Sequence, residues 1–202
     1  SWYSNYRNEW KAIIETVARE CGRAEIMVEK DTVQSMFLLG LSRVDLPFVF
    51  KGCTSLSKAY NLIYRFSEDI DLSIKDKLTE SERKASKECI IEIAHRAGME
   101  LANPNQIKSG YEYNRYVFQY ESLFSDKKME IIIETSYYQT VYPVEKNDVG
   151  SFVGRFCQER GITLPIPFEA ATVNMNVQSA ERTFIDKVFA ICDYRLQDKQ
   201  DR

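Results

Sequence analysis

Histidine is nearly absent from the sequence, which has 202 residues and a single histidine. His95 lies among apolar residues at helical spacing and has no acid or nucleophile pattern beside it, so we interpret it as an ordinary helix residue. A mechanism built on histidine is therefore unattractive. The sequence also lacks an apolar run of about 18 residues, which a membrane-spanning helix requires, and it lacks a basic-then-apolar leader. We therefore expect neither a membrane span nor a secretion signal.

Paired cysteines and a strong net charge are missing as well. The five cysteines include no Cys-x-x-Cys pair and have no histidine pattern near them, which favours reduced thiols and a cytoplasmic protein. The formal net charge is −3, so the chain as a whole does not attract nucleic acid, and RNA would have to bind a local basic face. Hydrophobic residues make up 44% of the chain, which predicts a globular protein with a sizeable core.

Glycine is scarce in the middle of the chain, where Gly52 is the only one between positions 41 and 98. It follows a short apolar stretch at residues 48–50 and precedes a stretch with helical spacing. Because glycine permits a tight turn, we predict a strand, a turn and a helix capped by Thr54 or Ser55. The apolar side of this helix is expected to consist of Leu56, Tyr60, Ile63 and Tyr64.

Residues 69–74, with the sequence DIDLSI, alternate strictly between polar and apolar side chains. A strand with this pattern points Asp69, Asp71 and Ser73 to one face. The two carboxylates are then about 6 to 7 Å apart at the backbone, close enough to share one or two Mg²⁺ ions. An isolated Asp-x-Asp is more often a solvated strand face, but the glycine turn upstream opens a helix, and a helix start suits a phosphate. Together the two features predict a place for a nucleoside triphosphate and its metal.

A hairpin is predicted from two strands, at residues 111–120 and 128–137. In the second strand, Glu130, Ile132 and Glu134 face one way and the residues between them face the other way. The alternation alone does not distinguish the two glutamates from ordinary solvent-facing residues.

The remaining elements are predicted from apolar periodicity. Two helices precede residue 40, one with a stripe of four apolar residues and one over residues 26–39, and both are expected to shield the sheet. The stripe is formed by Trp10, Ile13, Ile14 and Val17. The later elements are a helix over 88–99, a turn-rich connection over 143–147, a helix over 149–160, a strand over 172–177, and a helix over 180–196 capped by Ser179.

Two stretches, KGCTSLSKAY at 51–60 and RFSEDIDL at 65–72, resemble the AbiEii/AbiGii-type nucleotidyltransferase toxins, a branch of the DNA polymerase β-like nucleotidyltransferase superfamily. The stretch ERTFIDK at 181–187 resembles the second motif of this family. The family usually has a second glycine where this chain has Cys53. The resemblance implies an α+β fold, in which a mixed sheet is flanked by helices. It divides the chain into a nucleotidyltransferase domain at 1–178 and, at 179–202, the start of a helical C-terminal domain that is not complete here.

The resemblance also assigns roles to individual residues. Asp69, Asp71 and Glu130 are expected to hold two Mg²⁺ ions, with Glu134 as the alternative to Glu130. Lys187 is expected to contact the nucleotide, and with the three carboxylates it forms the expected catalytic set. The expected nucleotide-binding residues are Lys51, Gly52, Cys53, Thr54, Ser55, Ser67 and Lys187.

The function implied by this resemblance is the transfer of a nucleotidyl group from a nucleoside triphosphate to an acceptor hydroxyl. The implied acceptor is RNA, such as the 3′ end of tRNA, and the implied setting is a toxin–antitoxin or phage-defence pair with a cognate antitoxin. Two alternatives remain open. One is a metal-dependent nuclease, because grouped carboxylates also serve such enzymes. The other is an inactive nucleotide-binding subunit of the same fold.

Overall fold

The computed structural model describes residues 5–63, 67–74, 77–104, 108–109, 113–137, 143–163 and 172–200. The helices in this part of the chain are α2 (Arg7–Cys21), α3 (Glu25–Ser42), α4 (Gly52–Lys58), α5 (Glu80–Arg96), α6 (Phe152–Arg160) and α7 (Ala180–Gln200). The strands are β1 (Phe48–Lys51), β2 (Asp69–Ile74), β3 (Glu100–Leu101), β4 (Lys108–Ser109), β5 (Tyr113–Tyr120), β6 (Met129–Ser136), β7 (Val144–Gly150) and β8 (Thr172–Gln178).

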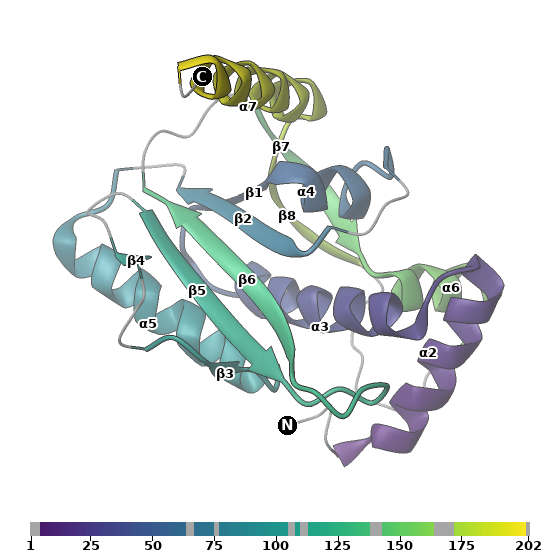
Figure 1. Ribbon diagram of the computed structural model, residues 1–202. Helices are drawn as coiled ribbons and strands as arrows, with labels where there is room; N and C mark the ends of the chain where they lie inside the picture. Colours follow the sequence, from purple (N-terminus) through teal and green to yellow (C-terminus); the bar gives the residue numbers. More distant parts are fainter. Residues whose placement is uncertain are drawn as a thin grey trace.

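All of these strands belong to one mixed sheet, which is the frame of the molecule (Figure 1). Their order is β3-β5-β6-β2-β1-β8-β7, and β4 pairs with β5. The pairs β2–β6 and β1–β8 are parallel, whereas the other pairs are antiparallel. The predicted fold class, a mixed sheet flanked by helices, is therefore confirmed.

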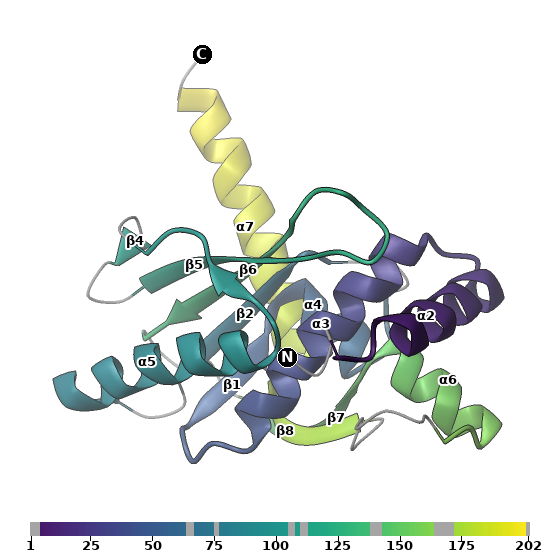
Figure 2. The same cartoon turned by 90° about the horizontal axis from the view of Figure 1, so that it is seen from below.

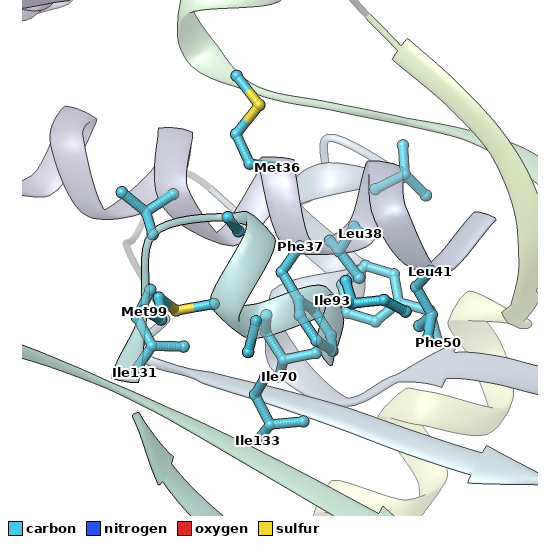
Figure 3. Packing of buried hydrophobic residues seen from close by; sticks show 14 of the residues in the cluster. Met36, Phe37, Leu38, Leu41, Phe50, Ile70, Ile93, Met99, Ile131 and Ile133 are labelled. Carbon is cyan, nitrogen blue, oxygen red and sulfur yellow. The ribbon is translucent and has the colours of Figure 1, made fainter. Parts of the chain in front are cut away.

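Helices α3 and α5 cover one face of this sheet, as Figures 1 and 2 show from two directions. The core lies between these helices and the central strands. In Figure 3, Phe37 of α3 lies against Ile70 of β2 and Ile133 of β6, and all three side chains are fully buried. Burying a side chain of this size contributes about 1.5–3 kcal/mol, so this layer fixes which face of the central strands points inward.

The other face of the central strands is polar and partly open. On β6, Ile131 and Ile133 are fully buried, whereas Glu134 is half-buried and Glu130 is exposed. The same alternation runs along β5. Because side chains of a strand point alternately to opposite faces, the inward packing of the isoleucines places the glutamates on the open face.

The predicted strand–turn–helix–strand unit is present, but its helix is shorter than expected. α4 ends at Lys58, so Tyr60 and Ile63 follow the helix, and Tyr64 lies outside the described residues. The predicted cap is wrong too, because the residue before the helix is Lys51 and it makes no capping hydrogen bond through its side chain. Thr54 and Ser55 are inside the helix, where both are buried.

The helix predicted at residues 88–99 begins eight residues earlier, at Glu80. Its start is a capping box, in which the backbone N–H of Thr79 donates to Glu82 Oε2 at 2.7 Å and the N–H of Glu82 donates to Thr79 Oγ1 at 3.3 Å. The signal was present in the sequence as Thr-x-x-Glu. The polar composition of the first turns concealed it because those turns face solvent.

The turn-rich connection predicted at residues 143–147 is instead part of strand β7, and α6 starts only at Phe152. β7 is an edge strand that pairs antiparallel with β8. Three of its seven residues are exposed and only the last two are buried, so the apolar alternation that identifies a strand is lost. The predicted hairpin, the strand before residue 178 and the last helix are confirmed, with Ser179 Oγ accepting from the N–H of Arg182 at 3.3 Å.

The two predicted N-terminal helices are also present, as α2 and α3. All five cysteines are free thiols. Among the helices that the structure describes, none has both the length and the apolar composition that crossing a membrane requires.

Candidate active site

Four charged side chains form a row across adjacent strands on the open face of the sheet. Lys51 of β1 is registered with Asp71 of β2, Asp71 with Glu134 of β6, and Glu134 with Arg115 of β5. Residues that are paired in register point to the same face and have Cβ atoms about 5 Å apart. The charge row, as we call these four residues, therefore places two carboxylates side by side between two cations.

Glu134, and not Glu130, is the glutamate that the structure brings to the aspartates. Parallel pairing sets Glu134 opposite Asp71 and Ile132 opposite Asp69. Glu130 lies further along the same face, where it is opposite Gln119 and accepts a hydrogen bond of 2.8 Å from that amide. The expected position of Glu130 in the metal site thus finds no support in the geometry, and the alternative glutamate occupies that place.

Burial and repulsion by Glu134 raise the pKa values of both aspartates. Burial raises the pKa of Asp71 to about 6, with a further contribution from Glu134, while Lys51 and Lys187 oppose the shift. Burial and Glu134 likewise raise the pKa of Asp69. Like charges held this close in a partly buried site favour any partner that neutralises them, either a proton or a cation.

The donor set of Asp69, Asp71 and Glu134 fits a hard divalent cation. All the available ligands are carboxylate oxygens, which Mg²⁺ prefers. In the described parts of the chain, however, no three acidic, histidine or cysteine side chains are gathered as a metal site. Glu134 is instead engaged with Arg115, whose Nε lies 3.4 Å from Glu134 Oε1. The three carboxylates thus share one face without converging on one point.

Gly52 is required by its contact with Asp71. Its φ is +77°, in the left-handed region, and a Cβ at this position would lie 1.9 Å from Asp71 Oδ2. No real side chain tolerates such a distance, so every other residue would displace the carboxylate. The glycine that the sequence singled out as a turn is therefore a close-approach position within the site itself.

The hydroxyl groups at the start of α4 are used within the fold. Thr54 Oγ1 donates a short hydrogen bond to the carbonyl of Asp69, and Ser55 Oγ donates to the carbonyl of Gly52 at 2.8 Å. Both side chains are buried. The Thr54 bond ties the helix to the strand that carries the aspartates, and the Ser55 bond lies within the helix. A role of either hydroxyl in nucleotide binding stays a prediction. A role of half-buried Cys53 in nucleotide binding stays a prediction.

A cavity of about 150 Å³ lies between the glycine turn and α7. Lys187, the residue expected to contact the nucleotide, lines it together with members of the charge row, although 116 positions separate it from Asp71 in the sequence. Asp186 is oriented by Gln178, whose Nε2 donates to Asp186 Oδ2 at 2.9 Å. The full lining is Lys51, Gly52, Asp71, Gln178, Thr183, Asp186, Lys187 and Ala190.

Gln34 of α3 positions the segment that enters β2. Its Nε2 donates to the carbonyl of Ser67 at 3.1 Å and to the carbonyl of Glu68 at 3.0 Å, and its side chain is fully buried. No sequence pattern indicates this role. Ser67 was expected to bind the nucleotide, and its described contact is this backbone one, so the expectation stays a prediction.

A buried ion pair anchors the end of α4. Lys58 Nζ lies 2.5 Å from Asp31 Oδ1, and the other oxygen of Asp31 accepts from the N–H of Phe152 at 2.8 Å. Burial lowers the pKa of Lys58, and the Asp31 charge opposes this shift. The pair connects α3, α4 and α6, and it holds the helix that carries Gly52 against the body of the protein.

A larger cavity, of about 400 Å³, lies at the far end of β5 and β6. It contains none of the residues that the sequence singled out for catalysis or nucleotide binding. Its lining mixes both signs of charge, and Lys128 is paired there with Glu100 and Glu121 at 3.3 Å each. We therefore assign the chemistry to the smaller cavity, beside the charge row.

Comparison with known proteins gives a family for the chain and similar folds. A family model described as the nucleotidyl transferase AbiEii toxin of a type IV toxin–antitoxin system matches residues 36–202. No curated protein matches the chain significantly.

Two similar solved structures come from Helicobacter pylori. JHP933 has a TM-score of 0.52 and 20% identity, with 81% of this chain and 56% of that one covered. A candidate nucleotidyltransferase has a TM-score of 0.53 and 20% identity, with 81% and 58% covered. At this identity the likeness shows the fold alone, and the chain spans a little over half the length of either structure.

Proposed function

Because the chain belongs to the AbiEii nucleotidyl transferase toxin family, we propose that it transfers a nucleotidyl group from a nucleoside triphosphate to an acceptor hydroxyl. The observation that carries this proposal is the charge row beside a cavity with two lysines. The paired carboxylates suit the binding of metal ions, and the lysines suit the binding of phosphates.

Asp69, Asp71 and Glu134 would hold Mg²⁺. When bound, the ions would make the acceptor hydroxyl easier to deprotonate and offset the charge of the leaving pyrophosphate. Glu134 contributes to the raised pKa values of Asp69 and Asp71 through repulsion, and a divalent cation would relieve this repulsion. We replace Glu130 by Glu134 in this set because the register puts Glu134 opposite Asp71.

Lys51 and Lys187 would bind the phosphates of the nucleotide. Both line the cavity next to Asp71, and both oppose the raised pKa of that residue. Gly52 leaves room for the Asp71 carboxylate between them. Catalysis would then rest on positioning and electrostatics, with no covalent intermediate on the protein.

The acceptor and the partners follow from the family. We propose RNA, such as the 3′ end of tRNA, as the acceptor, a cognate antitoxin as the genetic partner, and a cytoplasmic role in toxin–antitoxin or phage-defence systems. We also propose that residues 179–202 belong to a second, helical unit. Support for this last point is the outward side of α7, where large apolar side chains such as Phe184, Phe189 and Ile191 are exposed.

Incubation of the protein with Mg²⁺, total cellular RNA and each labelled nucleoside triphosphate in turn tests the proposal. We expect label to enter the RNA with wild-type protein and with Glu130→Gln, and not with Asp71→Asn or Glu134→Gln. Glu130→Gln is the matched control because it makes the same change on the same strand face. Shortened RNA would identify a nuclease, and triphosphate binding without transfer to any acceptor would identify an inactive binding subunit. Either result would overturn the proposal.

A further inference from the structure

Strand β5 presents two hydrogen-bond donors to one carboxylate of the site. Arg115 is registered with Glu134, and its Nε lies 3.4 Å from Glu134 Oε1. Tyr113, two residues earlier on the same face, donates a hydrogen bond to Glu134 from its hydroxyl group. Burial and this bond raise the pKa of Tyr113, so the hydroxyl keeps its proton at neutral pH. The donors therefore act together on a single acceptor.

These donors hold Glu134 on the side away from the nucleotide cavity. Arg115 is on β5, while Lys51 and the cavity are on the other side of the aspartates, as the strand order β5-β6-β2-β1 in Figure 1 shows. The described carboxylates are not gathered as a metal site. The strand register thus places Glu134 beside Asp71, where a cation could bind. Its side chain, however, contacts Arg115 and Tyr113.

The charges of the charge row indicate what would release Glu134 from Arg115. Lys51 and Arg115 balance the charges of Asp71 and Glu134, so the charge row is neutral without a metal. A divalent cation alone would relieve the repulsion between the carboxylates but would also add positive charge beside Arg115, which weakens its binding. A cation that arrives with a triphosphate brings its own compensating negative charge.

We propose that Arg115 and Tyr113 are positioning residues that hold Glu134 away from the ion until metal and nucleotide bind together. This inference rests on the proposed function and adds to it an order of events. The metal binds weakly by itself, and Glu134 exchanges Arg115 for the ion when the triphosphate arrives. Arg115, once released, remains beside the site as a cation for the reacting phosphates.

Binding of Mn²⁺ to nucleotide-free protein, measured by calorimetry, tests this without any turnover. We expect Arg115→Gln to bind Mn²⁺ about tenfold more tightly than wild type, a difference of about 1.4 kcal/mol. Tyr113→Phe should tighten it about twofold, because only one hydrogen bond is removed. Arg115→Lys keeps the positive charge and should restore weak binding. A merely structural role of Arg115 predicts the opposite sign, since a damaged site binds more weakly.

Arg96→Gln is the matched control, because Arg96 pairs with Glu92 on the exposed side of α5, away from the site, and its loss should leave Mn²⁺ binding unchanged. Unchanged or weaker binding in both Arg115→Gln and Tyr113→Phe would overturn the inference. Should Arg115→Gln fail to fold, Tyr113→Phe decides alone. Asp71→Asn separates the two proposals. If it binds Mn²⁺ as wild type does, the ion site itself is misplaced and both fail. If it loses Mn²⁺ binding while Arg115→Gln and Tyr113→Phe do not gain it, this inference fails alone.

Discussion

Asp71 is the residue on which most of the site's contacts converge. It stands between Lys51 and Glu134 in the charge row, it lies against Gly52, and it lines the cavity next to Lys187. Its ionised form is costly in the metal-free fold, because burial and Glu134 both raise its pKa, to about 6. A cation bound beside Asp71 would offset this cost.

Replacement of Asp71 by asparagine should abolish transfer and stabilise the metal-free protein near neutral pH. The folded pKa of about 6 exceeds the ordinary value of 3.8, so the folded state binds the proton more tightly and ionisation opposes folding. The penalty is absent below about pH 4 and complete above about pH 6, where it is at most about 3 kcal/mol. Urea unfolding should therefore give equal stabilities at about pH 4 and a more stable variant at about pH 7.5.

Asp148→Asn is the control for this measurement, because Asp148 is an exposed aspartate on edge strand β7. Its stability should follow that of wild type within about 0.5 kcal/mol at both pH values. Equal stabilities of Asp71→Asn and wild type near neutral pH would contradict the assigned environment of Asp71.

Gly52→Ala should disrupt the site more than its backbone strain alone explains. The added Cβ would lie 1.9 Å from Asp71 Oδ2, so the carboxylate has to move. Gly161 offers a matched control, since it also has a positive φ, +62°, but has nothing within 4 Å of an added Cβ. We expect Gly161→Ala to lose about 1 kcal/mol and keep activity, whereas Gly52→Ala loses more than tenfold in transfer rate. Full activity of Gly52→Ala would show that Asp71 is not held at this turn.

At the scale of elements, α4 depends on charges buried beneath it. Lys58 and Asp31 are 2% and 6% exposed, so the loss of either partner leaves the other buried and uncompensated. We expect Asp31→Ala to lower the free energy of unfolding by about 3–5 kcal/mol. The double variant Asp31→Leu/Lys58→Met should lose less than the sum of the single losses, because no buried charge then remains.

Denaturant unfolding measures these differences, and an exposed ion pair provides the comparison. Arg160 and Glu20 lie 2.9 Å apart at the surface. Glu20→Ala should cost less than about 1 kcal/mol, as exposed pairs do. A similarly small cost for Asp31→Ala would mean that the Lys58 pair does not anchor α4.

Local patterns predicted most elements, and they failed where solvent or a distant partner decides the structure. The central unit and the hairpin carry apolar periodicity against the core, whereas the last helix was found from its periodicity although its large apolar side chains are exposed. β7 has only two buried residues, and its strand state is set by its pairing with β8. The early start of α5 was readable from Thr79 and Glu82, but only as a capping signal and not as apolar periodicity.

The composition of the site was less predictable than the fold. Period-two alternation puts Glu130 and Glu134 on one face, so a choice between them requires the register between β2 and β6, which no local pattern contains. Arg115 and Gln34 reach the site from other elements for the same reason. Asp69, Asp71, Gly52 and Lys187 were found because they lie in motifs, and the structure does bring Asp71, Gly52 and Lys187 to one cavity.

At the scale of the whole molecule, the two sides of α7 have different surroundings. Thr183, Asp186 and Lys187 face the cavity, while Phe189 and Ile191 are 62% and 63% exposed on a helix that extends beyond the sheet (Figure 2). In this structure those apolar side chains contribute little to the fold. We therefore expect Phe189→Ser and Ile191→Ser to change the free energy of unfolding by less than about 0.5 kcal/mol.

Thermal unfolding of the two variants, with fully buried Phe50→Ser as the contrast, measures this. A loss above about 1 kcal/mol in either α7 variant would show that the outer side of the helix is covered in solution.

The order of the strands along the chain delays the completion of the site during protein synthesis. β1 lies between β2 and β8, so the strand that carries Lys51 keeps an unpaired edge until residues 172–178 have left the ribosome. Lys187 emerges later still, on α7. A nascent chain therefore holds both aspartates and Glu134 well before it has the side of the cavity that α7 supplies. A ribosome that stalls before residue 187 would therefore release a fragment that has the carboxylates but lacks Lys187 and the α7 side of the cavity.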